Sequence, residues 1–207
     1  GRVWERWEIE RAMELFQKYD VFVISDEIWS DLTLDGHQHI PTQSISPDAR
    51  NRTIALYAPS KTFNLAGLVG SYHIIFNKML RDRVEAKSRK SHYNTMNVLS
   101  MHALIGAYEA EGYTWVNELC QVLSENVDYA VNHIRDYYRG IEVSKPQGTY
   151  MLFLDCEDWC EENYKSLDEL LKAGWDVGVA WQDGRPFHQK YGIRMNLALP
   201  LGRVKEA

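Results

Sequence analysis

A lysine and an aspartate each follow a short apolar run in this sequence, and together they could support covalent chemistry on a cofactor. Lys61 comes after the run 54–58, and Asp26 comes after the run 21–24. Both runs are short, rich in β-branched and aromatic residues and bounded by polar residues, which is typical of buried strands. If the two strands are parallel neighbours, their carboxyl ends meet in one crevice, where open α/β sheets bind ligands. An amine and an anion that converge there suit pyridoxal phosphate (PLP), which needs one of each.

Both residues also have ordinary structural interpretations. Lys61 could be a loop lysine that points to water, and Asp26 could be a strand-end carboxylate that caps a turn. The neighbours of Lys61 favour the cofactor, because Ser60 and Thr62 supply hydroxyl groups of the kind that a phosphate site requires. Pro59 favours a turn at the same place.

A third candidate, Arg194, lies inside the apolar run 193–198. A charge in an apolar strand is costly unless it is paired. The guanidinium could bind the α-carboxylate of an amino-acid substrate through two hydrogen bonds, or it could form a structural salt bridge. The segment by itself leaves both possibilities open.

Helical and strand patterns alternate in the first part of the chain. We predict a helix over 6–19, strands over 21–24 and 54–58, and a third strand over 70–76. This alternation is typical of an α/β sheet. About eight residues separate Lys61 from the third strand, which is too few for the helical crossover of a parallel pair. We therefore expect the third strand to be antiparallel to its partner.

The second part of the chain is predicted to be helical first and then mixed. Helices are expected over 78–90 and 98–111, the second apolar enough to be buried on most sides, and a long helix runs from Trp115 to Tyr137. A small α+β unit is expected after it, with strands over 141–143, 150–155, 177–180 and 193–199 and a helix over 167–172. The predicted domains are 1–112, a connecting helix over 113–139, and 140–207.

Composition and charge argue against several classes of function. The formal net charge of −6 gives no basic surface for nucleic acid or an anionic membrane. We find no apolar stretch as long as a membrane span and no signal peptide. The three cysteines lack metal-site spacing, so we expect reduced thiols in a cytoplasmic protein and no metal. His37 and His39 lie in a loop flanked by Gly and Pro, where we expect solvated side chains.

Four segments, in order along the chain, together resemble the class I/II aminotransferase family of PLP enzymes with the type I fold. Segment 58–68 is similar to the family's Schiff-base lysine motif, 25–28 to its pyridine-nitrogen motif, and 145–150 to the turn that opens its small domain. Arg194 falls where the family binds the substrate carboxylate. The resemblance implies an α/β fold: the C-terminal half of the large domain, with a mixed, mostly parallel sheet, plus an α+β small domain.

The same resemblance implies that the N-terminal half of such an enzyme would precede Gly1 and that the intact protein is a homodimer. Only about three strands of the large-domain sheet are expected here, so we also expect an exposed sheet edge, which tends to recruit another strand.

Within the family, the segment around Lys61 is most similar to the carbon–sulfur β-lyases of the MalY/PatB type, including cystathionine β-lyases and cystalysin. Val69 stands where many transaminating relatives place an arginine for the phosphate. Trp29 stands where transaminases commonly have tyrosine and the lyase branch often has histidine; its indole N–H can donate a hydrogen bond but cannot accept a proton. The resemblance assigns cofactor contacts to Asp26, Trp29, Ser60 and Lys61, and substrate binding to Arg194.

The leading hypothesis is a PLP-dependent β-lyase that releases a thiol, pyruvate and ammonia from a sulfur amino acid, with Lys61 as general base. A PLP-dependent aminotransferase is the first alternative. A non-catalytic interaction or regulatory module is another, because half of such an enzyme cannot assemble a complete site. The expected partners are a small amino-acid substrate and a second copy of the protein, with no nucleic acid and no membrane.

Overall fold

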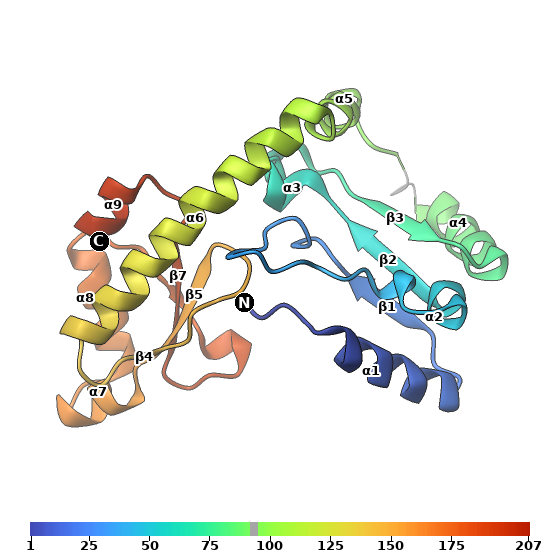
Figure 1. Cartoon of the computed structure of the whole chain (residues 1–207). Coiled ribbons are helices and arrows are strands. Elements are labelled where there is room, and N and C mark those ends of the chain that lie inside the picture. The colour runs from blue at the N-terminus through green and yellow to red at the C-terminus, as the bar shows by residue number, and fades with distance from the viewer. Residues whose placement is uncertain (92–94) are drawn as a thin grey trace. The chain divides into compact units, whose positions relative to one another are not determined.

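The computed structural model describes residues 1–91 and 95–207, which form two compact units. The unit that contains Lys61, here called the lysine unit, comprises residues 3–33 and 38–117. The arginine unit, which contains Arg194, comprises residues 1–2, 34–37 and 118–207. Helix α6 (Ala110–Tyr137) begins in the first unit and continues in the second (Figure 1). It ends at Tyr137, as predicted for the long helix, but starts five residues earlier than predicted. The domain limits given above stay predictions.

The lysine unit is built on a mixed sheet, in which the described strands are ordered β1–β2–β3. Strands β1 (Val23–Asp26) and β2 (Thr53–Tyr57) are parallel, and β3 (Tyr72–Ile75) runs antiparallel to β2. Both pairings agree with the sequence predictions, and the α/β fold class is confirmed. Asp26 pairs in register with Leu56, so the carboxyl ends of β1 and β2 lie at the same edge of the sheet.

The connection between β1 and β2 contains a helix that the sequence analysis treated as a loop. Helix α2 (Pro47–Arg52) has proline at its first position, and the Ser46 hydroxyl accepts a hydrogen bond from the Ala49 N–H at 3.0 Å. Both features are typical of helix starts. The buried Arg52 guanidinium forms a bidentate ion pair with the Asp48 carboxylate and donates to the Val21 carbonyl at 2.9 Å. This side chain therefore ties α2 to the start of β1.

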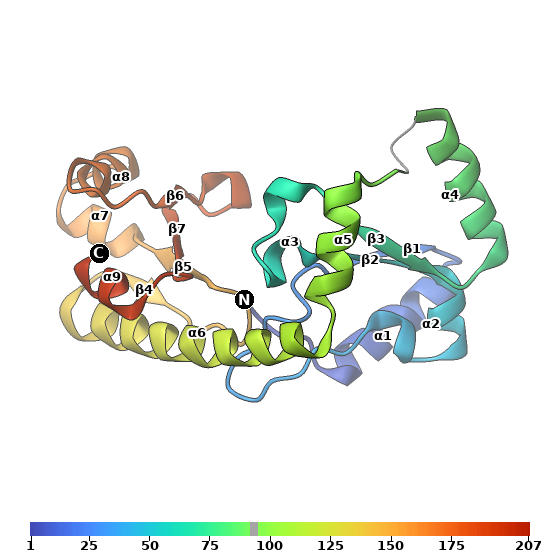
Figure 2. The same cartoon turned by 90° about the horizontal axis from the view of Figure 1, so that it is seen from above.

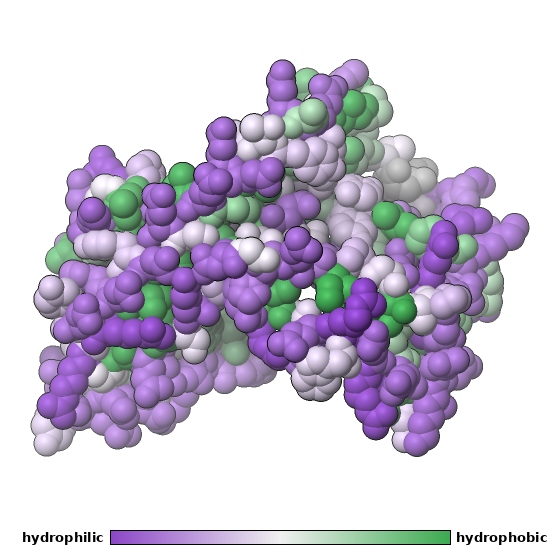
Figure 3. All heavy atoms as spheres, in the orientation of Figure 1, coloured by the Kyte–Doolittle hydropathy of each residue, from purple (hydrophilic) through white to green (hydrophobic). Residues whose placement is uncertain are grey.

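The other helical elements of the lysine unit are α1 (Arg6–Lys18), α3 (Pro59–Thr62), α4 (Lys78–Ser91) and α5 (Val98–Ala107), with short 3-10 turns at Thr42–Ser44 and Ala66–Leu68. The prediction that the 98–111 helix would be buried on most sides is wrong. Helix α5 ends at Ala107, and Val98, Leu99 and Ile105 are 65%, 72% and 54% exposed. Figure 3 shows hydrophobic side chains at the surface of this helix, because no described element of the unit covers that face.

The arginine unit contains an antiparallel sheet, with its described strands in the order β4–β5–β7–β6. These are β4 (Glu142–Val143), β5 (Met151–Asp155), β7 (Gly192–Asn196) and β6 (Gln182–Asp183). The predicted strand over 177–180 is wrong. Those residues end helix α8 (Leu167–Asp176): Val179 N–H donates to the Gly174 carbonyl at 2.8 Å, and Gly178 adopts φ +89°. This is the geometry of a helix C-terminus, in which the amides of 177–179 donate to the last carbonyls of the helix instead of to a strand.

Helices α6, α7 (Glu157–Glu162), α8 and α9 (Leu201–Glu206) are grouped around this sheet (Figures 1 and 2). A 3-10 turn, η3 (Arg185–Phe187), follows β6. The buried Asn126 of α6 donates from Nδ2 to the carbonyls of Leu197 and Leu199 at 2.9 and 2.8 Å, which fixes α6 against the end of β7. Across both described ranges, no helix combines the length and the apolar character that crossing a membrane requires.

Candidate functional site

Lys61 lies on α3, four residues beyond the end of β2, and its side chain is half-buried. Its Nζ atom is 5.7 Å from the centre of the Trp29 ring, so the structure brings these two predicted site residues together. Within the described ranges, Lys61 forms no salt bridge and no hydrogen bond through its amine. No acid within those ranges therefore neutralises the amine.

Asp26 is the last residue of β1 and is exposed. Its Oδ1 atom accepts a hydrogen bond from the Ile28 N–H at 3.2 Å, which is the turn-capping role that the sequence analysis named as the alternative. Oδ2 has no partner among the residues that the structure describes. One carboxylate oxygen thus caps the turn, and the other remains open to a ligand.

The two hydroxyl residues that flank the lysine differ in their surroundings. The half-buried Ser60 hydroxyl has no hydrogen-bond partner in the described part of the chain. Thr62 is completely buried, and its hydroxyl donates to Asp31 Oδ2 at 2.8 Å. The expectation that both hydroxyls would serve a phosphate therefore needs correction, because the Thr62 proton is committed to Asp31. Sequence reasoning had not singled out Asp31.

Aromatic packing supports the turn that carries the lysine. The Phe63 ring meets Tyr108 edge-on at 5.2 Å and stacks on Trp115 at 6.1 Å. Tyr108 in turn meets Tyr72 of β3 at 6.0 Å. Burial, followed by a hydrogen bond with Tyr72, raises the pKa of the Tyr108 hydroxyl, so this group stays neutral. Phe63, two positions after Lys61, therefore packs against the C-cap of α5 and against α6. Through Tyr108 it is also linked to β3.

The sequence analysis also missed a buried carboxylate, Glu27, directly after Asp26. Glu27 is 4% exposed and accepts hydrogen bonds from the Tyr57 hydroxyl at 2.7 Å, the Ser25 hydroxyl at 2.9 Å and the Thr42 N–H at 3.1 Å. Its Oε2 atom also lies 2.7 Å from His39 Nε2. We call these five residues the Glu27 cluster.

Two forces oppose each other at the Glu27 carboxylate. Burial raises the pKa of Glu27, but the hydrogen bonds from the rest of the cluster outweigh it and lower that pKa to about 2. The expectation that His39 would be a solvated loop residue is wrong, since its imidazole contacts this carboxylate. The sequence offered one signal for the burial of Glu27. Side chains alternate along a strand, which puts Glu27 on the opposite face from Asp26.

Arg194 lies in the middle of β7, in register with Phe153 of β5 and Gln182 of β6. Nη1 donates to Gln182 Oε1 at 2.9 Å, and the guanidinium carbon is 4.2 Å from the centre of the Phe187 ring. The structural salt bridge considered above is not found among the described residues. Asp26, Trp29, Ser60 and Lys61 belong to the lysine unit, whereas Arg194 belongs to the arginine unit.

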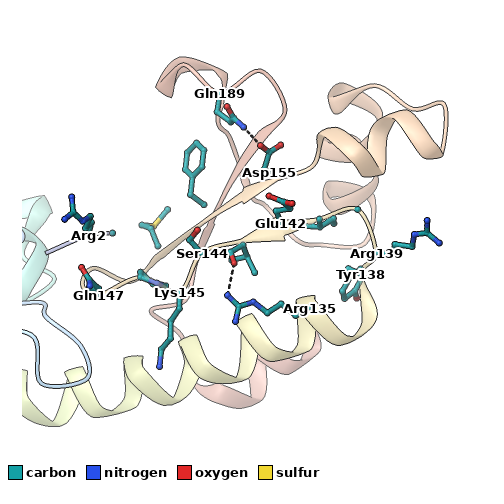
Figure 4. Close-up of a pocket in the computed structure, with 17 residues that line it drawn as sticks. Arg2, Arg135, Tyr138, Arg139, Glu142, Ser144, Lys145, Gln147, Asp155 and Gln189 are labelled. Carbon is teal, nitrogen blue, oxygen red and sulfur yellow. Dashed lines mark hydrogen bonds between the residues drawn. The ribbon is translucent and has the colours of Figure 1, made fainter.

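The arginine unit also contains an open cavity of about 930 Å³, whose lining includes none of the predicted site residues (Figure 4). Its basic side chains are already engaged: Arg135 donates to the Val143 carbonyl at 3.1 Å, Arg139 pairs with Glu162 at 3.3 Å, and Lys145 pairs with Asp35 and Asp128 at 2.7 and 2.5 Å. Elsewhere in the cavity lining, the Gln189 side chain donates a hydrogen bond to the Asp155 carboxylate. These internal pairings give no basis for assigning a ligand to the cavity.

Comparisons with known proteins support the family resemblance that the sequence motifs indicated. The model of the family described as aminotransferase class I and II matches residues 1–207. The cystathionine β-lyase PatB of Bacillus subtilis is 32% identical over 174 residues, which cover 84% of this chain and 45% of PatB. Protein MalY of Escherichia coli is 30% identical over 211 residues, which cover 100% of this chain and 52% of MalY. An aspartate aminotransferase of Bacillus subtilis also matches, with 25% identity.

The fold of this chain is also similar to solved structures of PLP-containing proteins. The structure of cystalysin from Treponema denticola, which contains PLP, superposes with a TM-score of 0.89 at 28% identity, over 100% of this chain and 52% of cystalysin. The chain thus spans about half the length of the proteins it matches.

Proposed function

Because the chain belongs to the aminotransferase class I and II family, as its four motifs predicted, we propose that it forms part of a PLP-dependent carbon–sulfur β-lyase. The proposed reaction releases a thiol, pyruvate and ammonia from a sulfur amino acid such as cystathionine. The similarity to PatB, MalY and cystalysin supports the lyase branch. A single observation carries the proposal: the parallel neighbours β1 and β2 lead to Asp26 and Lys61, and the Lys61 amine has no acid partner among the described residues.

The donor set of the lysine unit suits pyridoxal phosphate. The cofactor needs an amine for its aldehyde carbon, an anion for its ring nitrogen and donors for its phosphate. Lys61, Asp26 and Ser60 would supply these groups, and each has an atom with no partner among the described residues. Trp29 lies beside the lysine and would provide an aromatic wall. When bound, the cofactor acts as an electron sink for bonds at the substrate α-carbon.

Two residues of this chain would handle the substrate itself. Lys61 Nζ would accept the α-proton of the substrate as general base. Arg194 would bind the α-carboxylate, because a guanidinium can donate two parallel hydrogen bonds to a carboxylate. The absence of an acid partner for Arg194 within the described ranges supports this role, because such a partner would compete with the substrate.

The decisive experiment is borohydride reduction of the full-length gene product, followed by mass spectrometry of its peptides. We expect a phosphopyridoxyl group on Lys61 and none after Lys61→Ala. Lys87→Ala is a suitable control, because Lys87 is an exposed residue of α4. The same protein should convert cystathionine to pyruvate and a free thiol without an added keto acid. Labelling at a different lysine would refute the assignment of the site.

An aminotransferase is the second candidate, and the match to an aspartate aminotransferase over the whole chain favours it. Such an enzyme would use the same lysine, aspartate and arginine but would transfer the amino group to an acceptor keto acid and release the keto acid of the substrate. Product analysis separates the two reactions. Strict dependence of turnover on an acceptor keto acid, with the carbon–sulfur bond left intact, would favour the aminotransferase.

A further inference from the structure

Three side chains lie in one line across the sheet of the arginine unit. Arg194 of β7 is paired in register with Phe153 of β5 on one side and with Gln182 of β6 on the other. Residues paired directly in this way project from the same face of a sheet. Leu152 and Leu154, the neighbours of Phe153, are buried on the opposite face. The face that carries Arg194 is therefore the one that points away from the core of the unit.

Two groups hold the Arg194 guanidinium on this face. Gln182 Oε1 accepts from Nη1 at 2.9 Å and fixes one end of the planar group. The Phe187 ring, presented by η3, lies 4.2 Å from the guanidinium carbon, a distance at which a cation is attracted to an aromatic face. Phe153 meets Phe187 edge-on at 6.4 Å and supports that ring from β5.

The neighbouring Arg185 shows the usual alternative. Its guanidinium is bound by the carboxylates of Asp183 and Asp168 at 2.8 and 2.6 Å, so its charge is neutralised inside the protein. The partners of Arg194 are a neutral amide and an aromatic ring, which orient a guanidinium without cancelling its charge. A guanidinium has five N–H donors, and the contact with Gln182 uses one of them. The others have no partner among the described residues and can bind an anion.

We propose that Gln182 and Phe187 are positioning residues that hold Arg194 in the orientation in which it binds the substrate α-carboxylate. The inference rests on the proposed function for the identity of that anion. An unrestrained arginine side chain loses many rotamers when it binds a ligand, and a restrained one has already lost them before binding. Removing either restraint should therefore weaken carboxylate binding and leave the chemistry at the α-carbon unchanged.

Matched substitutions in the full-length gene product test this. Phe187→Leu removes the aromatic face, and Phe187→Tyr keeps it. Gln182→Met removes the acceptor at similar size, whereas Gln182→Glu places a carboxylate against Arg194. We expect the KM for cystathionine to rise about fivefold in Phe187→Leu and in Gln182→Met, with kcat changed less than about twofold. Phe187→Tyr should restore the wild-type KM, and Gln182→Glu should raise KM more than about tenfold by competition with the substrate.

A pair of inhibitors isolates the carboxylate. L-Alaninamide has a neutral carboxamide in place of the carboxylate of L-alanine, and neither has a leaving group on the β-carbon. Phe187→Leu should raise the inhibition constant of L-alanine about fivefold and leave that of L-alaninamide within about twofold. Equal losses for both ligands would mean general damage to the fold and would overturn the proposal, as would unchanged KM values in both Phe187→Leu and Gln182→Met.

A readout without turnover separates this inference from the proposed function. In protein labelled with ¹⁵N-arginine, the Arg194 Nε–H signal should show restricted motion in the wild type and faster motion in Phe187→Leu and Gln182→Met. Arg83, an exposed residue of α4 whose side chain has no hydrogen bond or ion pair with another described residue, is the mobile reference. If lyase activity is absent but these changes occur, the positioning role stands and the proposed function fails. If Arg194 is as mobile as Arg83 in the wild type, the positioning role is refuted.

Discussion

The Nε2 atom of His39 lies 2.7 Å from Oε2 of Glu27, and this contact joins the segment before α2 to the end of strand β1. Tyr57, the last residue of β2, donates to the same carboxylate oxygen at 2.7 Å. The Glu27 cluster therefore ties together both strand ends that precede the predicted cofactor residues. Since Asp26 is the adjacent residue, the position of its backbone depends on this buried carboxylate.

The first prediction concerns the pH dependence of Glu27→Gln. The folded-state pKa of Glu27, about 2, lies below its unfolded value of about 4.5, so the ionised group stabilises the fold. This contribution is complete above about pH 4.5 and is lost as the pH falls through about 2. We expect the variant to lose on the order of 2 kcal/mol of unfolding free energy at pH 7, measured by urea denaturation. The difference from wild type should shrink between pH 4.5 and 2, and a constant difference would contradict the prediction.

Tyr57→Phe provides a graded comparison within the same cluster. It removes one hydrogen-bond donor to Glu27 and leaves the carboxylate in place with its other donors. The expected loss at pH 7 is about 1 kcal/mol, which is smaller than for Glu27→Gln. Urea denaturation under identical conditions measures both. A larger loss for Tyr57→Phe than for Glu27→Gln would contradict the prediction, because phenylalanine keeps the ring that stacks on Tyr72 at 5.5 Å.

Asn126 supports a prediction about the arginine unit. Asn126→Leu would leave the carbonyls of Leu197 and Leu199 without their amide donor in a buried place, which should cost about 2–3 kcal/mol of unfolding free energy. Asn117→Leu is the matched control, because Asn117 is an exposed residue of the same helix. The control should change stability by less than about 0.5 kcal/mol. Hydrogen exchange of the α6 amides would place the effect in this unit, and similar losses in both variants would refute the role of the amide.

Val69 adopts a backbone conformation that is unfavourable for a β-branched residue. Its φ is +46°, and its side chain is 80% exposed, so few contacts compensate for the strain. Val69→Gly should stabilise the protein by about 1 kcal/mol in thermal or urea unfolding. Val177 is similarly exposed, at 78%, but has φ −101°. Val177→Gly should therefore destabilise the protein, because glycine there only adds freedom to the unfolded chain.

The exposed apolar face of α5 predicts self-association of this 207-residue chain. Val98, Leu99 and Ile105 present a hydrophobic surface of the kind that marks interaction sites. Sedimentation velocity should show concentration-dependent oligomers, which Leu99→Lys should reduce. Leu15→Lys on α1, where the leucine is 41% exposed, is the control and should have little effect. A monomer at all concentrations would contradict the prediction.

Local patterns were sufficient for much of this molecule. The short apolar runs gave β1 and β2 to within two residues at either end, and the short link after Lys61 correctly required an antiparallel β3. These properties depend on a few consecutive residues and on the reach of the chain between them. The types of Lys61 and Arg194 in their segments suggested a chemistry and left an ordinary structural alternative open for each, because a charge beside or within an apolar strand needs a partner.

The tertiary structure alone decided which polar groups are paired. Glu27 is buried against His39 and Tyr57, 12 and 30 positions away, and Thr62 donates its proton to Asp31, 31 positions away. Periodicity tells which face a side chain occupies, but it does not tell which distant group meets it there. The neutral partners of Arg194 have the same origin, since strand register brings Gln182 beside it. Hydrogen bonds between distant segments depend on packing, and packing is a property of the whole fold.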